Sequence, residues 1–129
     1  ADIPNTPLYP FGYGLTYTTF KYSNYRVAKV NDKVQVQVTI TNTGQRDGEE
    51  VVQLYIRDKF ASIVRPVKEL KGFKKLALAA GKSVEVSFEL TKTDLSFYNA
   101  KGDLIFEPGA FDIMVGPNAA EVSTQTIVL

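Results

Sequence analysis

The chain has 129 residues, of which 44% are hydrophobic and 22% charged, a composition typical of a globular domain and not of a disordered or membrane-spanning chain. Its 15 basic and 14 acidic side chains leave a net charge of +1, so we expect neither nucleic acid nor a membrane as a partner. The sequence has no cysteine and no histidine, which excludes disulfides, thiolate metal sites and histidine-based catalysis, and we expect no cofactor and no metal.

The N-terminal segment is rich in aromatic rings and is interrupted by proline and glycine, as in PLYPFGYGLTYTTF (residues 7–20). Proline and glycine at this density disfavour both a helix and a regular central strand. The chain begins with Ala in a proline-rich stretch, which fits a domain boundary. We therefore predict a connector over residues 1–18 and a folded domain over residues 19–129. The rings of Phe20, Tyr22 and Tyr25 are expected to pack into that domain's core.

Three later segments alternate apolar and polar residues with the period of a β-strand. They are residues 34–41, 52–57 and 83–90. Each is expected to bury one face, and Tyr55 falls on the exposed face of the second. Residues 70–78 precede the turn at residues 79–82, and we predict that they pair with residues 83–90 as a hairpin, with three lysines marking an edge strand.

The remaining sequence reads as short strands and turns. Residues 93–96 predict a single helical turn, residues 97–100 and 103–106 a hairpin around Lys101–Gly102, and residues 111–115 and 122–129 two strands joined at Pro117–Asn118. No segment has the periodicity of a ten-residue helix. About seven short strands separated by turns indicate an all-β fold, an immunoglobulin-like antiparallel β-sandwich. Because the Cys, Trp, Cys pattern of antibody domains is absent, a fibronectin type III-like arrangement fits better.

Four blocks of the sequence, in this order, resemble the C-terminal fibronectin type III-like domain of glycoside hydrolase family 3, the family of β-glucosidases and β-xylosidases. The blocks are PLYPFGYGLTYTTF, TNTGQRDGEEVVQLYIRD, RPVKELKGFKKLALAAGKS and TDLSFYNAKGDLIFEPGAFDIMVG. The resemblance runs from about Pro7 to Gly116. It is specific for the domain and says little about the sugar.

The resemblance implies that catalysis lies elsewhere in a longer enzyme. In that family a (β/α)8-type domain carries an aspartate nucleophile and a following α/β domain usually supplies the acid/base glutamate. Nothing in this chain matches the motifs around those residues, so we assign no catalytic residue here and expect a non-catalytic accessory domain of a parent glycosidase. The sequence leaves the compartment open, with a secreted or periplasmic parent as the expectation.

The resemblance also gives the aromatic connector a role, because in such enzymes this segment joins the second catalytic domain to the sandwich. We infer that Tyr9, Phe11 and Tyr13 fill a groove between the two, where each buried ring stabilises the contact by about 2 kcal/mol. Phe60 and Ile63 lie in a loop and are candidates for a second contact, which would approach the catalytic face and border the active-site entrance.

A carbohydrate-binding module is the alternative interpretation, with the ring of Tyr55 stacking on a sugar face; a cross-strand aromatic contact would explain the same residue. The basic run at residues 65–75 is interpreted as a solvated edge strand, in which charges alternate with Val67, Leu70 and Phe73. The carboxylates at 47, 49, 50, 94, 103, 107 and 112 are explained by turns and caps, because a retaining glycosidase needs two carboxyl groups about 5 Å apart across a cleft.

Overall fold

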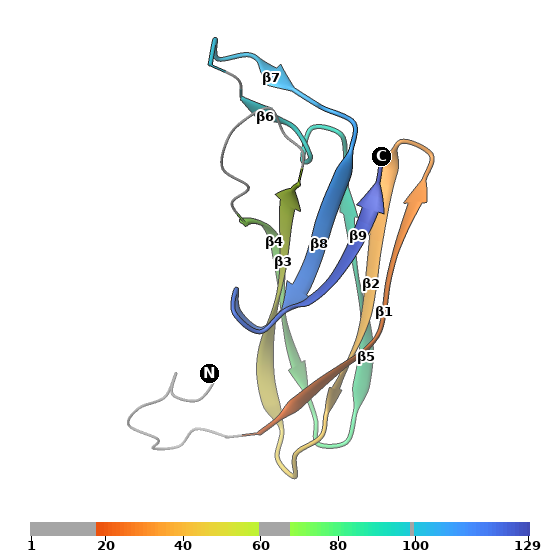
Figure 1. Ribbon diagram of the computed structural model, residues 1–129. Coiled ribbons are helices and arrows are strands. Elements are labelled where there is room, and N and C mark those ends of the chain that lie inside the picture. Colours follow the sequence, from red (N-terminus) through yellow and green to blue (C-terminus); the bar gives the residue numbers. More distant parts are fainter. Residues whose placement is uncertain (1–17, 60–67, 99) are drawn as a thin grey trace.

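The computed structural model describes residues 18–59, 68–98 and 100–129. Nine β-strands lie in these residues: β1 (Phe20–Val30), β2 (Lys33–Asn42), β3 (Gly48–Asp58), β4 (Glu69–Leu78), β5 (Ser83–Leu90), β6 (Phe97–Tyr98), β7 (Leu104–Ile105), β8 (Ala110–Gly116) and β9 (Ser123–Val128). A three-stranded sheet in the order β1-β2-β5 faces a four-stranded sheet in the order β4-β3-β8-β9 (Figure 1). All pairings are antiparallel, so the predicted all-β sandwich is confirmed.

The strands predicted from alternation are present with the expected faces. In β2, Val34, Val36, Val38 and Ile40 are buried, while the residues between them point away from the second sheet. The inward residues of β3 and most of those of β5 are likewise buried or half-buried. Val84 departs from the pattern, because it lies near the start of β5 and is 40% exposed.

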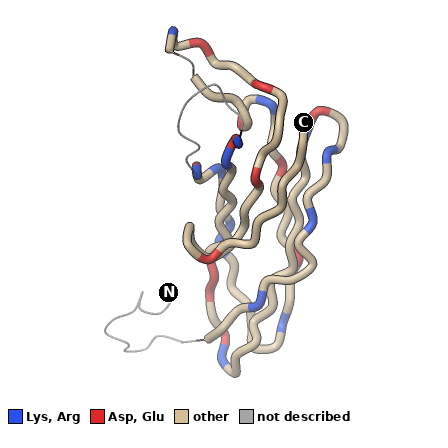
Figure 2. Tube along the Cα trace, in the orientation of Figure 1, with Lys and Arg blue, Asp and Glu red and all other residues tan. Residues whose placement is uncertain are grey.

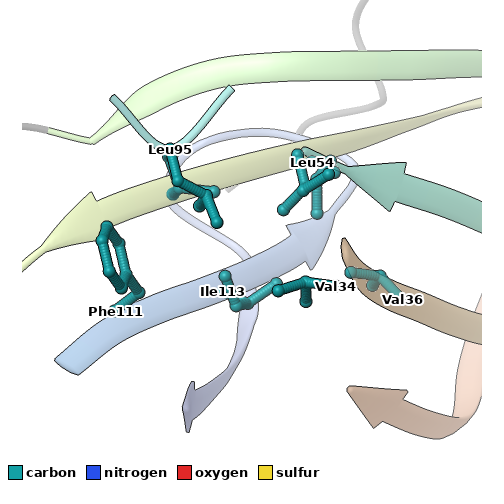
Figure 3. Close-up of a cluster of buried hydrophobic side chains, with 8 residues drawn as sticks. Val34, Val36, Leu54, Leu95, Phe111 and Ile113 are labelled. Carbon is teal, nitrogen blue, oxygen red and sulfur yellow. The ribbon is translucent and has the colours of Figure 1, made fainter. Parts of the chain in front are cut away.

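The core lies between the two sheets and is drawn from both. Val34 and Val36 of β2 meet Leu54 of β3 and Phe111 and Ile113 of β8 (Figure 3). Leu95, from the turn after β5, closes the same cluster at one end. Phe106 stacks on Phe111 at a centroid distance of 6.0 Å. A second cluster of buried residues, Val38, Ile40, Val52, Val86 and Val115, extends the core along the sandwich. A core of this extent lets the domain fold without crosslinks.

Strand β1 carries the aromatic residues that the sequence analysis assigned to the core. Phe20, Tyr22 and Tyr25 are half-buried and pack against the second half of the core, which confirms that prediction. A β-bulge between Ser23 and Arg26 lets Tyr22 and Tyr25 face inward although they are three residues apart. Asn24 within the bulge has φ 52°, a left-handed conformation that asparagine tolerates.

The predicted hairpin between residues 70–78 and 83–90 is wrong. Strand β4 pairs with β3, whereas β5 pairs with β2 in the other sheet. The turn at residues 79–82 therefore crosses from one layer to the other. It is bonded to the end of β2, because Gly81 N donates to Asn42 O (2.9 Å) and Asn42 N donates to Lys82 O (2.9 Å). The edge position of β4 is confirmed.

The shorter elements agree with the sequence. The amide of Leu95 donates to Thr91 O (3.2 Å) and Lys92 O (3.1 Å), which makes one helical turn. Strands β6 and β7 form the predicted hairpin, which projects beyond one end of the sandwich (Figure 1). Strand β8 is buried on both faces. Within the described residues no helix has the length and apolarity required to cross a membrane.

Candidate functional surface

The outer face of the four-stranded sheet carries an apolar patch along β3 and β4. On this face Val51 lies opposite Lys75, Gln53 opposite Phe73, and Tyr55 opposite Leu70. Phe73 is 64% exposed and Leu70 is 51% exposed. We call Val51, Tyr55, Leu70 and Phe73 the β3–β4 patch. The sequence analysis interpreted this run as a solvated edge strand and did not predict an apolar patch on it.

Strand β4 shows why these two residues face outward. Its inward residues are Gly72, Lys74, Leu76 and Leu78, which lie opposite the inward residues of β3. An added Cβ at Gly72 would lie 3.5 Å from the Phe88 ring, so that ring already fills the space behind the strand. The ammonium of Lys74 lies 5.4 Å from the centre of the same ring.

A loop over residues 117–121 covers the neighbouring part of this face. An added Cβ at Gly116 would lie 2.0 Å from Glu121 O, which shows how closely the loop lies on β8. Asn118 stabilises it, because its Oδ1 accepts from the amides of Ala120 and Glu121 at 2.9 Å each. Gln53 Nε2 also donates to Pro117 O (3.1 Å). The patch therefore has a fixed border on its β8 side.

An ion pair between Arg57 and Asp112 lies on the same outer face, and the Asp112 side chain is buried. Arg57 donates through Nε and Nη2 to Asp112 Oδ2 at 3.1 and 2.7 Å, and Thr126 Oγ1 donates to Asp112 Oδ1 at 2.7 Å. Burial would raise the pKa of Asp112, but these hydrogen bonds and the charges of Lys59 and Arg57 outweigh it and hold the pKa below its usual value. The sequence analysis placed Asp112 among turn and capping acids, whereas it lies within β8 and pairs β3 with β9.

Tyr55, the candidate for sugar stacking, is half-buried on this face. Its hydroxyl donates to Gln53 Oε1. Its cross-strand neighbours are Leu70 and Met114, the second of which is fully buried. The ring therefore belongs to the β3–β4 patch, and part of its surface is exposed. The other predicted contact residues, Tyr9, Phe11, Tyr13, Phe60 and Ile63, lie outside the described residues.

Two pockets lined by described residues each contain one side-chain carboxylate, Asp32 in the first and Glu89 in the second. A pocket of about 240 Å³ at one end of the sandwich is lined by Lys29, Asp32, Lys92, Leu95 and Phe106 among others. Of its described lining residues, Asp32 alone has a side-chain carboxylate. Across residues 18–59, 68–98 and 100–129 no group of three or more Asp or Glu residues is arranged to hold a metal ion.

One further acid, Glu50, lies between the sheets. Its carboxylate accepts a hydrogen bond from the Tyr22 hydroxyl (3.1 Å). Burial raises the pKa of Glu50 despite that hydrogen bond, and nearby Glu121 adds to the rise. Burial, with the charge of Glu50, also raises the pKa of Tyr22. The hydrogen bond between Tyr22 and Glu50 joins β1 to β3 across the interior.

Comparisons with known proteins identify the domain. The family model for the fibronectin type III-like domain (Fn3-like) matches residues 50–119, more than half of the chain. The chain belongs to the fibronectin type III-like domain family. A periplasmic β-glucosidase from Salmonella typhimurium is 44% identical over 94% of this chain, and a β-xylosidase from Formosa agariphila is 43% identical over 96%.

Solved structures give the same result for the fold. The family 3 β-glucosidase of Bifidobacterium adolescentis matches the Fn3-like domain with a TM-score of 0.83, 35% identity and 92% coverage of this chain. A β-glucosidase from Erythrobacter marinus matches with a TM-score of 0.82, 44% identity and 96% coverage. The Fn3-like domain spans only 16–18% of these four proteins. In each of them it is a minor part of a longer glycosidase.

The β3–β4 patch was missed by the sequence analysis, although a signal for it exists. Leu70 and Phe73 are three positions apart, and Phe73 is an odd number of positions from Leu76 and from Leu78. Because strand faces alternate with period two, these residues cannot all face inward on a regular strand. A β-bulge between Leu54 and Tyr55 resolves the conflict by placing Leu70 and Phe73 on one outer face.

Proposed function

We propose that this chain is a non-catalytic accessory domain of a family 3 glycoside hydrolase of the β-glucosidase or β-xylosidase type. The observation that carries the proposal is the coverage of its relatives. Two enzymes that are 43–44% identical align with 94–96% of this chain but with only 16–18% of their own length. The remaining length has room for catalytic domains, which fits a chain without histidine or cysteine.

The proposed role of the Fn3-like domain is to brace the catalytic domains. Tyr9, Phe11 and Tyr13 in the connector are the proposed main contact, with Phe60 and Ile63 as a second contact that borders the active-site entrance. Support for a rigid brace comes from the described part of the chain, where Thr18 Oγ1 donates to Asn42 Oδ1 (2.7 Å) and Asn42 Nδ2 donates to Leu78 O (2.9 Å). The connector thus leads directly into bonds that join the two sheets.

The test is to add the purified 129-residue chain to the parent enzyme lacking this domain, and to measure glycosidase activity and thermal midpoint. We expect recovery of both, with a smaller effect from a chain in which Tyr9, Phe11 and Tyr13 are replaced by Ser. The Tyr98→Ser chain is the control, because Tyr98 is an exposed ring (69%) on the β6–β7 hairpin and not in the connector. Failure of the wild-type chain to restore either quantity contradicts the proposal.

Carbohydrate binding is the second candidate function, and the position of Tyr55 on an outer sheet face favours it. Affinity electrophoresis of the chain in gels containing soluble β-glucan or xylan tests it directly. Retention that Tyr55→Ala abolishes and Tyr98→Ala leaves intact would support binding through the β3–β4 patch. Equal mobility with and without polysaccharide would reject this function for the isolated chain.

A further inference from the structure

The β3–β4 patch exposes side chains that the domain itself does not need on its surface. Phe73 and Leu70 are 64% and 51% exposed, and they lie on the edge strand β4. The lysines of β4 protect this edge against pairing with another strand, but they leave Leu70 and Phe73 exposed on the outer face. In the other sheet, β2 and β5 present polar or charged residues outward: Gln35, Gln37, Thr39, Thr41, Ser83, Glu85, Ser87 and Glu89. Other exposed apolar side chains, such as Tyr98 and Val128, lie on β6 and β9, so Leu70 and Phe73 are the exposed apolar pair within β3 and β4.

The fold fixes this exposure. The β-bulge between Leu54 and Tyr55 aligns Leu70 and Phe73 on one face, although their spacing of three would otherwise place them on opposite faces. Phe73 is kept from the interior because the Phe88 ring lies behind Gly72. A native register that holds two large apolar side chains outward is expected where another surface covers them.

We propose that the β3–β4 patch is a docking surface for the catalytic part of the parent enzyme, and that the opposing surface is apolar with carboxylates at its border. This inference rests on the proposed function and adds a second contact to that of the connector. Basic and acidic positions are interspersed over most of the fold (Figure 2). Residues 68–75 contain four lysines and one glutamate; Lys74 lies on the inward row, and Lys75 is paired at 3.5 Å with Glu49 in an exposed ion pair that a partner's carboxylate can replace. An opposing surface with acidic residues would complement that charge.

The same charges disfavour the two other occupants. A second copy of the chain would bring two lysine-rich strands together, which costs free energy by like-charge repulsion. The residues before Thr18 contain one charged side chain, Asp2, and so supply little complementary charge. By contrast, the relatives extend over a length about six times that of the Fn3-like domain, since this chain covers 16–18% of them. That body is the occupant to which we commit.

The first experiment measures the Kd between the fluorescently labelled 129-residue chain and the parent enzyme lacking this domain. We expect Phe73→Ser to weaken binding about 30-fold and Leu70→Ser combined with Phe73→Ser to weaken it further, as for aromatic anchors at other interfaces. Val30→Ser is the matched control, because Val30 is an exposed apolar residue (40%) on the other sheet, and it should change Kd by less than about twofold. Lys75→Glu should slow association and reduce its dependence on salt.

A second measurement avoids removing the ring. Because the chain has no cysteine, Lys75→Cys supplies one thiol beside the patch and Thr39→Cys one thiol on the outer face of the other sheet. Reaction of the first thiol with maleimide should slow about tenfold when the catalytic part is bound, because docking shields it. Reaction of the second should be unchanged.

The possible outcomes separate the two proposals. If the wild-type chain does not bind the catalytic part, the proposed function and this inference both fail. If it binds with unchanged affinity after Phe73→Ser and the double substitution, or if the thiol at position 75 stays reactive in the complex, the proposed function stands and the docking surface is wrong. Dimers of the isolated chain that Phe73→Ser dissociates in sedimentation velocity would assign the patch to self-association and overturn the inference.

Discussion

The two outer faces of the sandwich differ in polarity and in how their charged side chains are paired. On the three-stranded sheet, β2 and β5 expose polar side chains, and Arg26 pairs with Glu85 at 2.8 Å with 58% and 49% of the two side chains exposed. On the four-stranded sheet, Arg57 pairs with Asp112 at 2.7 Å, but only 4% of the Asp112 side chain is exposed. The first face is organised for water. The second is organised by internal hydrogen bonds around an apolar patch.

This difference teaches that the two faces of a small domain can differ in polarity, and only the face of the four-stranded sheet suits the docking role that we propose. The face of the four-stranded sheet has the loop at residues 117–121 on one side and the Arg57–Asp112 ion pair within it, so the sheet beneath Leu70 and Phe73 is braced by hydrogen bonds. Pre-organised apolar groups lose little conformational entropy on docking. We therefore expect substitutions on the two faces to have different consequences.

The largest expected effect comes from the buried ion pair. Asp112→Ala should lower the free energy of unfolding of the isolated chain by about 2 kcal/mol, because it leaves Arg57 and Thr126 without their shared partner. Glu85→Ala, which removes the corresponding acid from the other face, should cost about 0.5 kcal/mol or less. Urea denaturation at pH 7 measures both. Equal losses would remove the distinction between the faces.

The same variant has a signature in pH. Because the pKa of Asp112 is lowered in the folded state, its contribution is present above the unfolded pKa of about 3.9 and is lost as the pH falls through the folded pKa. The difference in stability between wild type and Asp112→Ala should thus shrink below about pH 4. A difference that stays constant between pH 7 and pH 3 would show that the carboxylate's charge is not its cause.

Gly116→Ala should be the next most destabilising change, at about 1.5 kcal/mol, because its Cβ would clash with Glu121 O at 2.0 Å and displace the loop that borders the patch. Thr124→Ala is the control, since Thr124 is an exposed residue on the same face in β9. Thermal melts measure the loss, and hydrogen exchange at residues 117–121 should quicken in the first variant only. Unchanged exchange there would mean that the loop does not depend on close contact with β8.

A smaller effect of opposite sign is expected inside the sandwich. Burial raises the pKa of Glu50, so folding favours its protonated form and the charged form lowers stability at neutral pH. Glu50→Gln keeps an acceptor for Tyr22 and should stabilise the chain by less than about 1 kcal/mol at pH 7. The gain should vanish below the unfolded pKa of about 4.3. Destabilisation at pH 7 would contradict the assigned shift.

The smallest effect is predicted at the patch itself. In the isolated chain Phe73→Ser should change stability by at most about 0.5 kcal/mol, because the ring is 64% exposed. Chemical denaturation measures this value, and the same preparation serves the docking experiments. A loss of several kcal/mol would mean that the ring packs on its own domain, and the contrast between the two faces would then need another basis.

The fold could be predicted from the sequence where one face of a strand is buried and the other is wet. Strand β2 is predicted for this reason, because polar residues alternate with its buried ones, Val34, Val36, Val38 and Ile40. Strand β1 was less visible because the bulge at Asn24 interrupts its alternation. The pairing of β4 was mispredicted because neighbouring strands were assumed to form a hairpin, whereas hydrogen bonds of the turn with Asn42 carry the chain into the other sheet.

The candidate surface depended on contacts between residues far apart in the sequence. Asp112 reads as a surface acid between Phe111 and Ile113, and its partners are 55 residues earlier and 14 residues later. Leu70 shares the outer face with Phe73 because a bulge at Lys71 of β4 shifts the register with β3, and the Phe88 ring of the other sheet lies behind Gly72. Local patterns contain neither fact. The one local sign of the outward Phe73 was its odd spacing from Leu76, because two residues three positions apart cannot share a face of a regular strand.

The amide side chain of Asn42 has a mechanical consequence for the domain. The Asn42 amide accepts a hydrogen bond from Thr18 and donates to Arg46 O (2.8 Å) and to Leu78 O (2.9 Å). Thr18, at the start of the described residues, is thereby linked to β2 in one sheet and to β4 in the other. A pulling force applied through the preceding residues would be divided between both layers at Asn42, and would not peel β1 away from its edge one bond at a time.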